Sequence, residues 1–239
     1  MYGHRARIGY ASPLFVTEVF AYEFYAIVPK GVTLMVSTLD IITRSKEEVE
    51  RTFERSLRAA EEMGRGGADV VVLGGNPVNL SRGVENLPDL IAGLERKIGT
   101  RVTTSTTSQI NALQALGASK IATVHPFTEV HAARHEDSIR KFGFEPAGTT
   151  GAGKELRDVG RIPKAAALDL ARKVKDANPI ADTIHFACAH WAVAEIIDAV
   201  EDELGVDVMT SHQAILWQAL RTAGIDDKIT GFGRLFREF

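Results

Sequence analysis

Short hydrophobic runs alternate with amphipathic stretches along the whole chain. The runs predict strands at residues 6–11, 32–39, 70–73, 101–104, 120–124, 183–187 and 206–210. Between them, apolar residues recur at helical spacing and predict helices at about 46–63, 106–116, 128–141, 163–177, 190–203 and 212–223. This alternation of strand and helix is typical of mostly parallel sheets flanked by helices. The fold class is therefore α/β.

Two stretches have distinctive local signals. The residues S-K-E-E at 45–48 are a capping box, which predicts that a helix begins at Lys46. Residues 148–162 are rich in glycine and have no regular pattern, so we expect a mobile loop there.

One hydrophobic pattern occurs twice. Residues 68–76 are A-D-V-V-V-L-G-G-N and residues 181–189 are A-D-T-I-H-F-A-C-A, so Gly75 aligns with Cys188, the only cysteine. A second strand follows in each half and ends in Thr-Ser, at V-T-T-S and at V-M-T-S. The duplication predicts two pseudo-symmetric lobes, with the active site in the cleft between them.

The repeat also gives domain boundaries. We assign residues 1–104 to the first lobe and residues 105–211 to the second. The C-terminal segment 212–239 is expected to pack back on the first lobe.

Composition narrows the class of protein. A hydrophobic content of 45% is ordinary for a soluble globular chain, and a net charge of −3 argues against a nucleic-acid partner. No apolar stretch reaches the roughly 18 residues of a membrane span, and the N-terminus M-Y-G-H-R-A-R has no signal-peptide pattern. We expect a cytoplasmic protein that binds a small molecule rather than a membrane. A closed, symmetric homo-oligomer is the general expectation.

Cys188 is the first candidate for chemistry. A single cysteine excludes an intramolecular disulfide and any multi-cysteine metal site. It follows a predicted strand and directly precedes a predicted helix, whose free N–H groups and dipole would lower the thiol pKa. A lone cysteine is otherwise a small buried hydrophobe. Its position in the repeat favours a role as acid or base.

Gly74, Gly75 and Asn76 form the matching turn in the first half. Glycine lets a substrate oxygen approach the backbone, and the amides that follow can hold a developing anion. A tight turn with positive φ explains the glycines equally well. Pro77 has no N–H, so the side chain and backbone N–H of Asn76 would supply the donors.

Several motifs resemble the aspartate/glutamate racemase superfamily. They are V-L-G-G-N-P-V-N-L-S-R-G at 72–83, V-T-T-S-T-T-S-Q-I-N-A-L at 102–113 and F-A-C-A-H-W at 186–191. The ending G-F-G-R-L-F at 231–236 is similar to that of arylmalonate decarboxylases. The resemblance extends over almost the whole chain and is to the branch that contains arylmalonate decarboxylase and maleate isomerase.

This resemblance implies a cofactor-independent and metal-independent reaction on a small carboxylate. Superfamily members usually offer one cysteine from each lobe, whereas glycine at 75 and cysteine at 188 is the arylmalonate decarboxylase pattern. One carboxylate of a malonate-type acid would leave as CO2, and the other would become an enediolate that Cys188 protonates. Gly75, Asn76 and Ala189 would frame the oxyanion site.

The chain departs from the family pattern in places. Phe127 occupies a position where family members usually have tyrosine, so the hydroxyl is missing. Thr17 or Glu18, in L-F-V-T-E at 14–18, is the nearest polar replacement for an asparagine of maleate isomerases. His190 gives the C-x-H pattern of glutamate racemases, and it could assist proton transfer to the thiol or cap a helix.

Other candidates lie at strand ends. Thr104 and Ser105, like their counterparts Thr210 and Ser211, are placed either to bind a carboxylate or to cap the helix that follows. His125 ends a predicted strand and could face the cleft.

Aromatic and histidine clusters are weaker candidates. Pro13 lies near an aromatic group at helical spacing, which predicts core packing or an apolar pocket; the group is Phe15, Phe20, Phe24 and Tyr25. His131 and His135 lie four residues apart, and we expect them to be solvated rather than to bind a metal.

Three functions therefore follow from the sequence. The first is the decarboxylase. The second is a cis-trans isomerase or racemase, in which His125, His190 or Glu18 replaces the missing cysteine. The third is a non-catalytic protein that binds a dicarboxylate.

Overall fold

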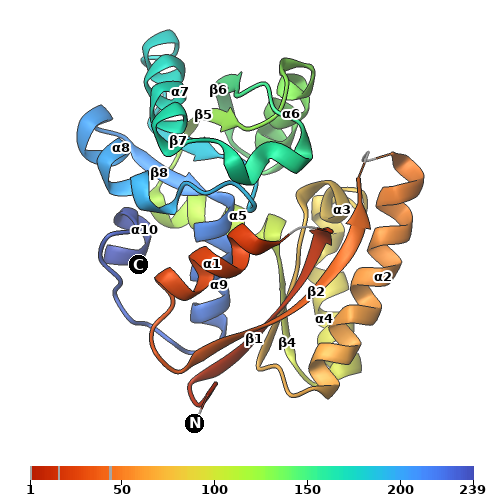
Figure 1. Ribbon diagram of the computed structural model, residues 1–239. Helices are drawn as coiled ribbons and strands as arrows, with labels where there is room; N and C mark the ends of the chain where they lie inside the picture. The colour runs from red at the N-terminus through yellow and green to blue at the C-terminus, as the bar shows by residue number, and fades with distance from the viewer. Residues whose placement is uncertain (1, 16, 43–44) are drawn as a thin grey trace. The chain divides into compact units, whose positions relative to one another are not determined.

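The computed structural model describes residues 2–15, 17–42 and 45–239. The chain forms two compact units. Unit 1 contains Met1–Gln109 and Ile215–Asp227, and unit 2 contains Ile110–Ala214 and Lys228–Phe239. Each unit is a four-stranded parallel sheet flanked by helices, which confirms the predicted α/β class (Figure 1).

Unit 1 contains the first sheet, in the strand order β2-β1-β3-β4. Its strands are β1 (Ala6–Leu14), β2 (Val32–Ile41), β3 (Val70–Leu73) and β4 (Arg101–Thr104). Its helices are α1 (Glu18–Ile27), α2 (Lys46–Arg65), α3 (Asn76–Leu80) and α4 (Leu87–Ile98), with a 3-10 turn at Val84–Asn86. The N–H of Glu48 donates to the Ser45 hydroxyl at 3.2 Å, which confirms the predicted start of α2.

Helices cover both faces of this sheet. Met63 of α2 and Leu94 of α4 share one hydrophobic cluster with Val71 and Leu73 of β3. On the other face, the ring of Phe20 in α1 stacks on Tyr10 of β1, with 3.8 Å between the ring centroids. Figure 1 shows α1 on the opposite side of β1 from α2 and α4. The strand ends are therefore held between two packed layers.

Unit 2 repeats the arrangement, in the strand order β6-β5-β7-β8. Its strands are β5 (Lys120–His125), β6 (Glu145–Gly151), β7 (Thr183–Phe186) and β8 (Asp207–Thr210). Its helices are α6 (Ala132–Lys141), α7 (Lys164–Ala177), α8 (Ile197–Leu204) and α10 (Gly233–Glu238), with 3-10 turns at Glu129–His131, Leu156–Arg161 and Ala194–Ile196. The identical strand order confirms the duplication.

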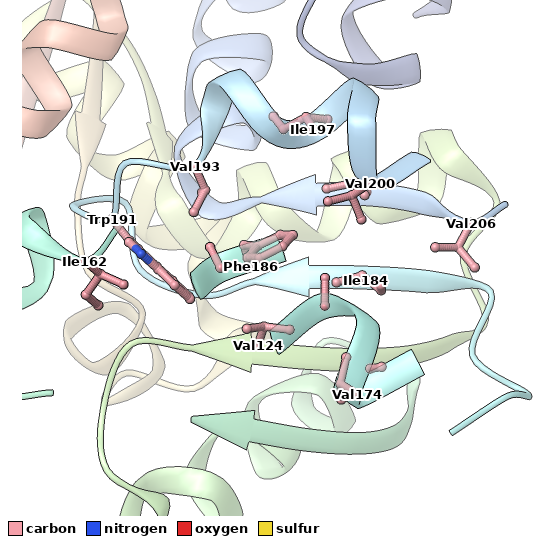
Figure 2. Close-up of a cluster of buried hydrophobic side chains, with 14 of the residues drawn as sticks. Val124, Ile162, Val174, Ile184, Phe186, Trp191, Val193, Ile197, Val200 and Val206 are labelled. Atoms are coloured by element: carbon pink, nitrogen blue, oxygen red, sulfur yellow. The ribbon is translucent and has the colours of Figure 1, made fainter. Parts of the chain in front are cut away.

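The core of unit 2 lies under α7 and α8 (Figure 2). Ile184 and Phe186 of β7 pack there against Val174 of α7 and Ile197 of α8. The ring of Trp191 meets Phe186 edge-on, with 5.8 Å between centroids. This packing fixes the chain on both sides of Cys188.

Two helices cross from one unit to the other along the chain. α5 (Ser105–Leu116) follows β4 and α9 (Ser211–Thr222) follows β8. The units change within these helices, at Gln109 and Ala214, rather than at residues 104 and 211. The reason is that each helix begins at a strand end of one unit and contributes its remaining turns to the other.

One strand was missed, and it occupies the beginning of the predicted loop. β6 pairs with β5 over part of the glycine-rich stretch 148–162, where the sequence predicts a mobile loop. Its residues are E-P-A-G-T-T-G, and most of them are only half-buried because β6 is the edge strand. An edge strand without large apolar residues has no periodic signal.

The C-terminal segment is divided between the two units. Residues 228–239 belong to unit 2, whereas residues 215–227 belong to unit 1. The guanidinium of Arg234 donates to both carboxylate oxygens of Asp207 at 2.6 Å and to the carbonyl of Leu116 at 2.7 Å. The N–H of Gly233 donates to Asp198 at 2.7 Å. These bonds attach α10 to β8 and α8.

Arg234→Ala is expected to lower the free energy of unfolding by about 1–2 kcal/mol, because it removes a bidentate, charge-assisted pair in a half-buried site. Urea unfolding followed by circular dichroism measures this. Arg172→Ala is the control, since Arg172 makes a similar pair with Glu203 that is more exposed. An effect at Arg234 no larger than that at Arg172 would contradict the anchoring role.

No helix in the described part of the chain is both long enough and apolar enough to cross a lipid bilayer.

Candidate functional site

The turns after β3 and β7 have the same positive φ at equivalent positions. Gly75 has φ 90° and Cys188 has φ 92°. Each carbonyl accepts a hydrogen bond from the residue three positions later, Val78 at 3.0 Å and Trp191 at 3.3 Å. The sequence repeat therefore extends to this backbone angle and to this hydrogen bond.

Cys188 is strained where Gly75 is not. It is the only non-glycine residue with positive φ among the residues that the structure describes. The left-handed conformation costs an ordinary residue about 1–2 kcal/mol and glycine almost nothing. Strain of this kind persists only where the surroundings hold it, and it concentrates at functional sites. A glycine would be less strained here, so the presence of a thiol at this turn favours a functional role.

The helix predicted to start directly after Cys188 is wrong. Residues 189–193 form a turn and irregular backbone, and α8 begins only at Ile197. Trp191 and Val193 are instead buried in the core of unit 2, and this draws the chain away from a helical path. No helix therefore begins at Cys188, and the predicted effect of a helix dipole on the half-buried thiol does not apply.

Polar side chains of unit 2 surround the Cys188 turn. The N–H of Cys188 donates to Ser211 Oγ at 3.2 Å, and the same oxygen lies 3.2 Å from His185 Nε2. Burial lowers the pKa of His185 to about 3 and, together with His212, that of His190 to about 3. Both imidazoles are therefore neutral at physiological pH.

The first-half turn is tightly packed against Pro13. A Cβ on Gly74 would lie 2.6 Å from the carbonyl oxygen of Ala11, and one on Gly75 would lie 2.9 Å from Pro13 Cγ. Contacts below 3.0 Å require the neighbour to move. Glycine is therefore required at this turn by space as well as, at Gly75, by φ.

Asn76 is held by a network of side chains from the start of α5. Its Nδ2 donates to Gln109 Oε1 at 3.1 Å, and Gln109 Nε2 donates back to Asn76 Oδ1 at 3.0 Å. The Thr106 hydroxyl also donates to Asn76 Oδ1, at 3.1 Å. A primary amide has two N–H donors, and this network uses one of them. Gln109 is not among the predicted site residues; its place one helical turn after Ser105 in α5 was the available signal.

Asn79 extends this network into the interior of unit 1. It is fully buried, and its Oδ1 accepts from Ser105 Oγ at 2.9 Å and from Thr106 N at 3.3 Å. Its Nδ2 has no hydrogen-bond partner within the described residues. The polar end of β4 is thus ordered without any charged side chain.

The chain matches a known protein family over most of its length. The model of the family described as arylmalonate decarboxylase matches residues 21–236. The chain belongs to the arylmalonate decarboxylase family. It is 29% identical over 210 residues to the arylmalonate decarboxylase of Bordetella bronchiseptica, covering 85% of this chain and 86% of the relative.

Solved structures support the family and the fold. Unliganded arylmalonate decarboxylase is 26% identical, with a TM-score of 0.85 over 98% of this chain and all of the other. The liganded form of a variant with one glycine replaced by cysteine and one cysteine by serine has a TM-score of 0.87, also at 26% identity and the same coverage. The maleate isomerase of Pseudomonas putida S16 has a TM-score of 0.85 at 21% identity, over 98% of each chain, which shows the shared fold alone.

Strand-end hydroxyls of this family member stabilise helix starts. Thr104 Oγ1 accepts from the N–H of Thr107 at 2.9 Å, which caps α5. In unit 2, Thr210 Oγ1 accepts from Gln213 N at 2.9 Å while Gln213 Oε1 accepts from Thr210 N at 3.1 Å. This is a reciprocal capping box. Contact of Thr104 and Ser105 with a substrate stays a prediction.

The segment 14–18 lies at the end of β1. Thr17 directly precedes α1, and its buried hydroxyl has no hydrogen-bond partner within the described residues. Glu18 is exposed at the first position of α1. Val16 lies outside the described residues. Of the aromatic group, Phe20 and Phe24 are in the core, whereas Phe15 and Tyr25 are exposed, so core packing holds for only two of the four.

The histidines near β5 make ring contacts with their neighbours. The ring of His125, fully buried at the end of β5, stacks on His135 with 4.4 Å between centroids. His131 meets Phe127 edge-on at 5.7 Å. His131 and His135 are half-buried, so the expectation that they are solvated holds only in part: each keeps an exposed fraction and also contacts an aromatic ring. No group of three potential metal ligands occurs among the described residues.

His190 and Ala189 complete the turn after Cys188. Both are buried, with exposed fractions of 6% and 9%. A neutral imidazole whose pKa is about 3 can accept a hydrogen bond at neutral pH but is rarely protonated. A role of His190 in proton transfer stays a prediction.

Acid is expected to destabilise the protein through these buried histidines. Since burial lowers the folded pKa of His190 to about 3, the unfolded state, with a pKa of about 6.5, binds more protons between these values. The stability is full above pH 6.5 and falls with decreasing pH, by at most about 1.4 kcal/mol per pH unit for each such histidine. His190→Asn should flatten this slope in urea unfolding at pH 7, 6, 5 and 4. A slope equal to that of the wild type would contradict the assignment.

Proposed function

We propose that this chain is a cofactor-independent decarboxylase of a malonate-type or related dicarboxylic acid. The observation that carries the proposal is Cys188, the only cysteine, in a strained turn whose counterpart in the first half contains Gly75. One thiol and one glycine provide a single proton donor. Racemisation by opposed acid and base would need a second such group.

The proposed reaction begins with loss of one carboxylate. The bond between this carboxylate and the α-carbon breaks, CO2 leaves, and the electron pair remains on the α-carbon and the second carboxylate as an enediolate. The Cys188 thiol then gives its proton to the α-carbon, and the resulting thiolate takes a proton from water. Electrons and protons balance without an oxidant or a reductant.

Asn76 is proposed to stabilise the enediolate. The N–H of its side chain that does not bind Gln109 is a fixed donor, because the rest of the amide makes four hydrogen bonds. A donor that is already oriented does not have to reorganise as charge develops, and this is the main source of oxyanion stabilisation. The backbone N–H groups of Asn76 and Ala189 are further candidate donors.

Membership of the arylmalonate decarboxylase family supports this reaction class. The remaining candidates for substrate contact are Pro13, Thr17, Glu18, Thr104, Ser105, His125, Phe127 and His190. Of these, Pro13 packs directly on the Gly75 turn and would present an apolar surface to the departing carboxylate. Desolvation of that carboxylate favours the loss of neutral CO2.

The direct test is incubation of the protein with phenylmalonate, methylphenylmalonate, maleate and a panel of amino acids. Release of CO2, cis-trans geometry and optical rotation are followed together. Release of CO2 without an added cofactor is the expected result. Fumarate or racemised product without CO2 would replace the proposal with an isomerase or racemase. Saturable binding of a dicarboxylate with no turnover would replace it with a binding protein.

A further inference from the structure

The Ser211 hydroxyl contacts both Cys188 and His185. It is the first residue of α9, buried at the end of β8, and its Oγ accepts the N–H of Cys188 at 3.2 Å. The same Oγ lies 3.2 Å from Nε2 of His185 in β7. The three residues form one buried chain, imidazole to hydroxyl to backbone amide.

The hydrogen bond to Cys188 acts on the strained dihedral. The N–H lies in the plane of the preceding peptide. Rotation of that plane about the N–Cα bond changes φ, so a fixed N–H direction holds φ. Cys188 at φ 92° would relax toward negative φ if its N–H lost a fixed acceptor. Relaxation would turn the peptide and move Cβ and the thiol with it.

His185 is placed to orient the Ser211 hydroxyl. Successive side chains of a strand point to opposite faces, so His185 lies on the face of β7 opposite to Ile184 and Phe186, which are in the core. Its ring is 3% exposed, and its Nδ1 has no hydrogen-bond partner within the described residues. Either tautomer brings Nε2 to the hydroxyl, as donor or as acceptor. Ser211 is therefore the hydrogen-bond partner of the His185 ring among the described residues.

We propose that Ser211 is a positioning residue that holds the Cys188 turn in its strained conformation, and that His185 acts through Ser211 by fixing the direction of its hydroxyl. Neither residue donates a proton to the substrate. The consequence for catalysis rests on the proposed function, but the consequence for the thiol does not, since the reactivity of a thiol can be measured without any substrate.

The test is alkylation of Cys188 by iodoacetamide across pH 6–10, which gives an apparent thiol pKa and a limiting rate for the only cysteine in the chain. Ser211→Ala should shift the apparent pKa by about 0.5 unit or more and change the limiting rate by about fivefold or more, because thiolate exposure and environment change with orientation. Ser211→Thr, which retains a hydroxyl, should stay close to the wild type. Ser56→Ala is the matched control, since it removes another buried hydroxyl, which donates to the carbonyl of Phe53 at 2.6 Å.

A second set of variants tests whether His185 acts through Ser211. His185→Leu should change the alkylation profile in the same direction as Ser211→Ala, whereas His185→Gln, which keeps a polar group near the Nε2 position, should restore part of it. The double variant should be no further from the wild type than Ser211→Ala alone, because effects along one chain of contacts are not additive. Additive effects would overturn the assignment of His185.

If the enzyme releases CO2, Ser211→Ala should lower kcat by about tenfold or more and leave KM within about threefold, because a misplaced proton donor affects the chemical step rather than binding. An alkylation profile of Ser211→Ala identical to that of the wild type would overturn the proposal even if decarboxylation is observed. A changed profile in a protein that turns over no malonate would support the positioning role and reject the proposed reaction. If Ser211→Ala does not fold, the pair His185→Leu and His185→Gln decides in the same way.

Discussion

Replacement of Cys188 by glycine is expected to slow turnover strongly and, at the same time, to give a more stable protein than replacement by alanine. Loss of a proton donor should slow the reaction by about 10²–10⁴-fold in both variants. Only glycine adopts φ 92° without strain, so Cys188→Gly should exceed Cys188→Ala in free energy of unfolding by about 1 kcal/mol.

Thermal unfolding and CO2 release measure the two effects separately. For a chain of this size, 1 kcal/mol corresponds to a difference of about 2–4 °C in Tm. The two variants control for each other, because both lack the thiol and differ only in backbone preference. Full activity in either variant would reject Cys188 as the proton donor. Equal stability of the two would show that the turn is not under strain.

Replacement of Asn76 by alanine is expected to lower kcat by about 10²–10³-fold, the usual effect of removing one oriented donor from an oxyanion site. The amide of Asn76 is held by Gln109 and Thr106, so its remaining N–H has a fixed direction. Asn76→Asp should be at least as inactive, because it keeps the size of the side chain but replaces the donor with a negative charge.

Single-turnover measurements of CO2 release and near-ultraviolet circular dichroism should accompany these variants. Asn86→Ala is the matched control: Asn86 also donates from its side chain, to the carbonyl of Arg82 at 2.8 Å, but it is exposed and lies on another turn of unit 1. A kcat for Asn76→Ala within about threefold of the wild type, with the fold intact, would assign the oxyanion contact to backbone donors instead.

Several elements follow from short stretches of sequence alone. β3 and β4 have the predicted bounds because each is a run of four residues that ends at a clear turn or helix start. The capping box at Ser45 places the start of α2 for the same reason, since a cap and its partner are three residues apart. The duplication is also visible in the sequence, including the alignment of Gly75 with Cys188, and the two sheets confirm it.

Other elements depend on contacts that no local pattern records. β6 has no strand signal because it is an edge strand that gains its order from pairing with β5. The run A-H-W-A-V after Cys188 has the composition of a helix start, yet burial of Trp191 and Val193 in the core of unit 2 delays α8 to Ile197. In both cases tertiary packing outweighs the local preference of the chain.

In the candidate site too, some features follow from the sequence and others only from tertiary contacts. The sequence by itself determined which residue types stand at the two turns, namely the thiol of Cys188 and the amide of Asn76. Only the tertiary structure decided how they are held, through Ser211 for the one and Gln109 for the other, at separations of 23 and 33 residues. The physical reason is that caps and periodicity act over a few residues, whereas these hydrogen bonds form only after parallel strands bring their ends to the same edge of a sheet.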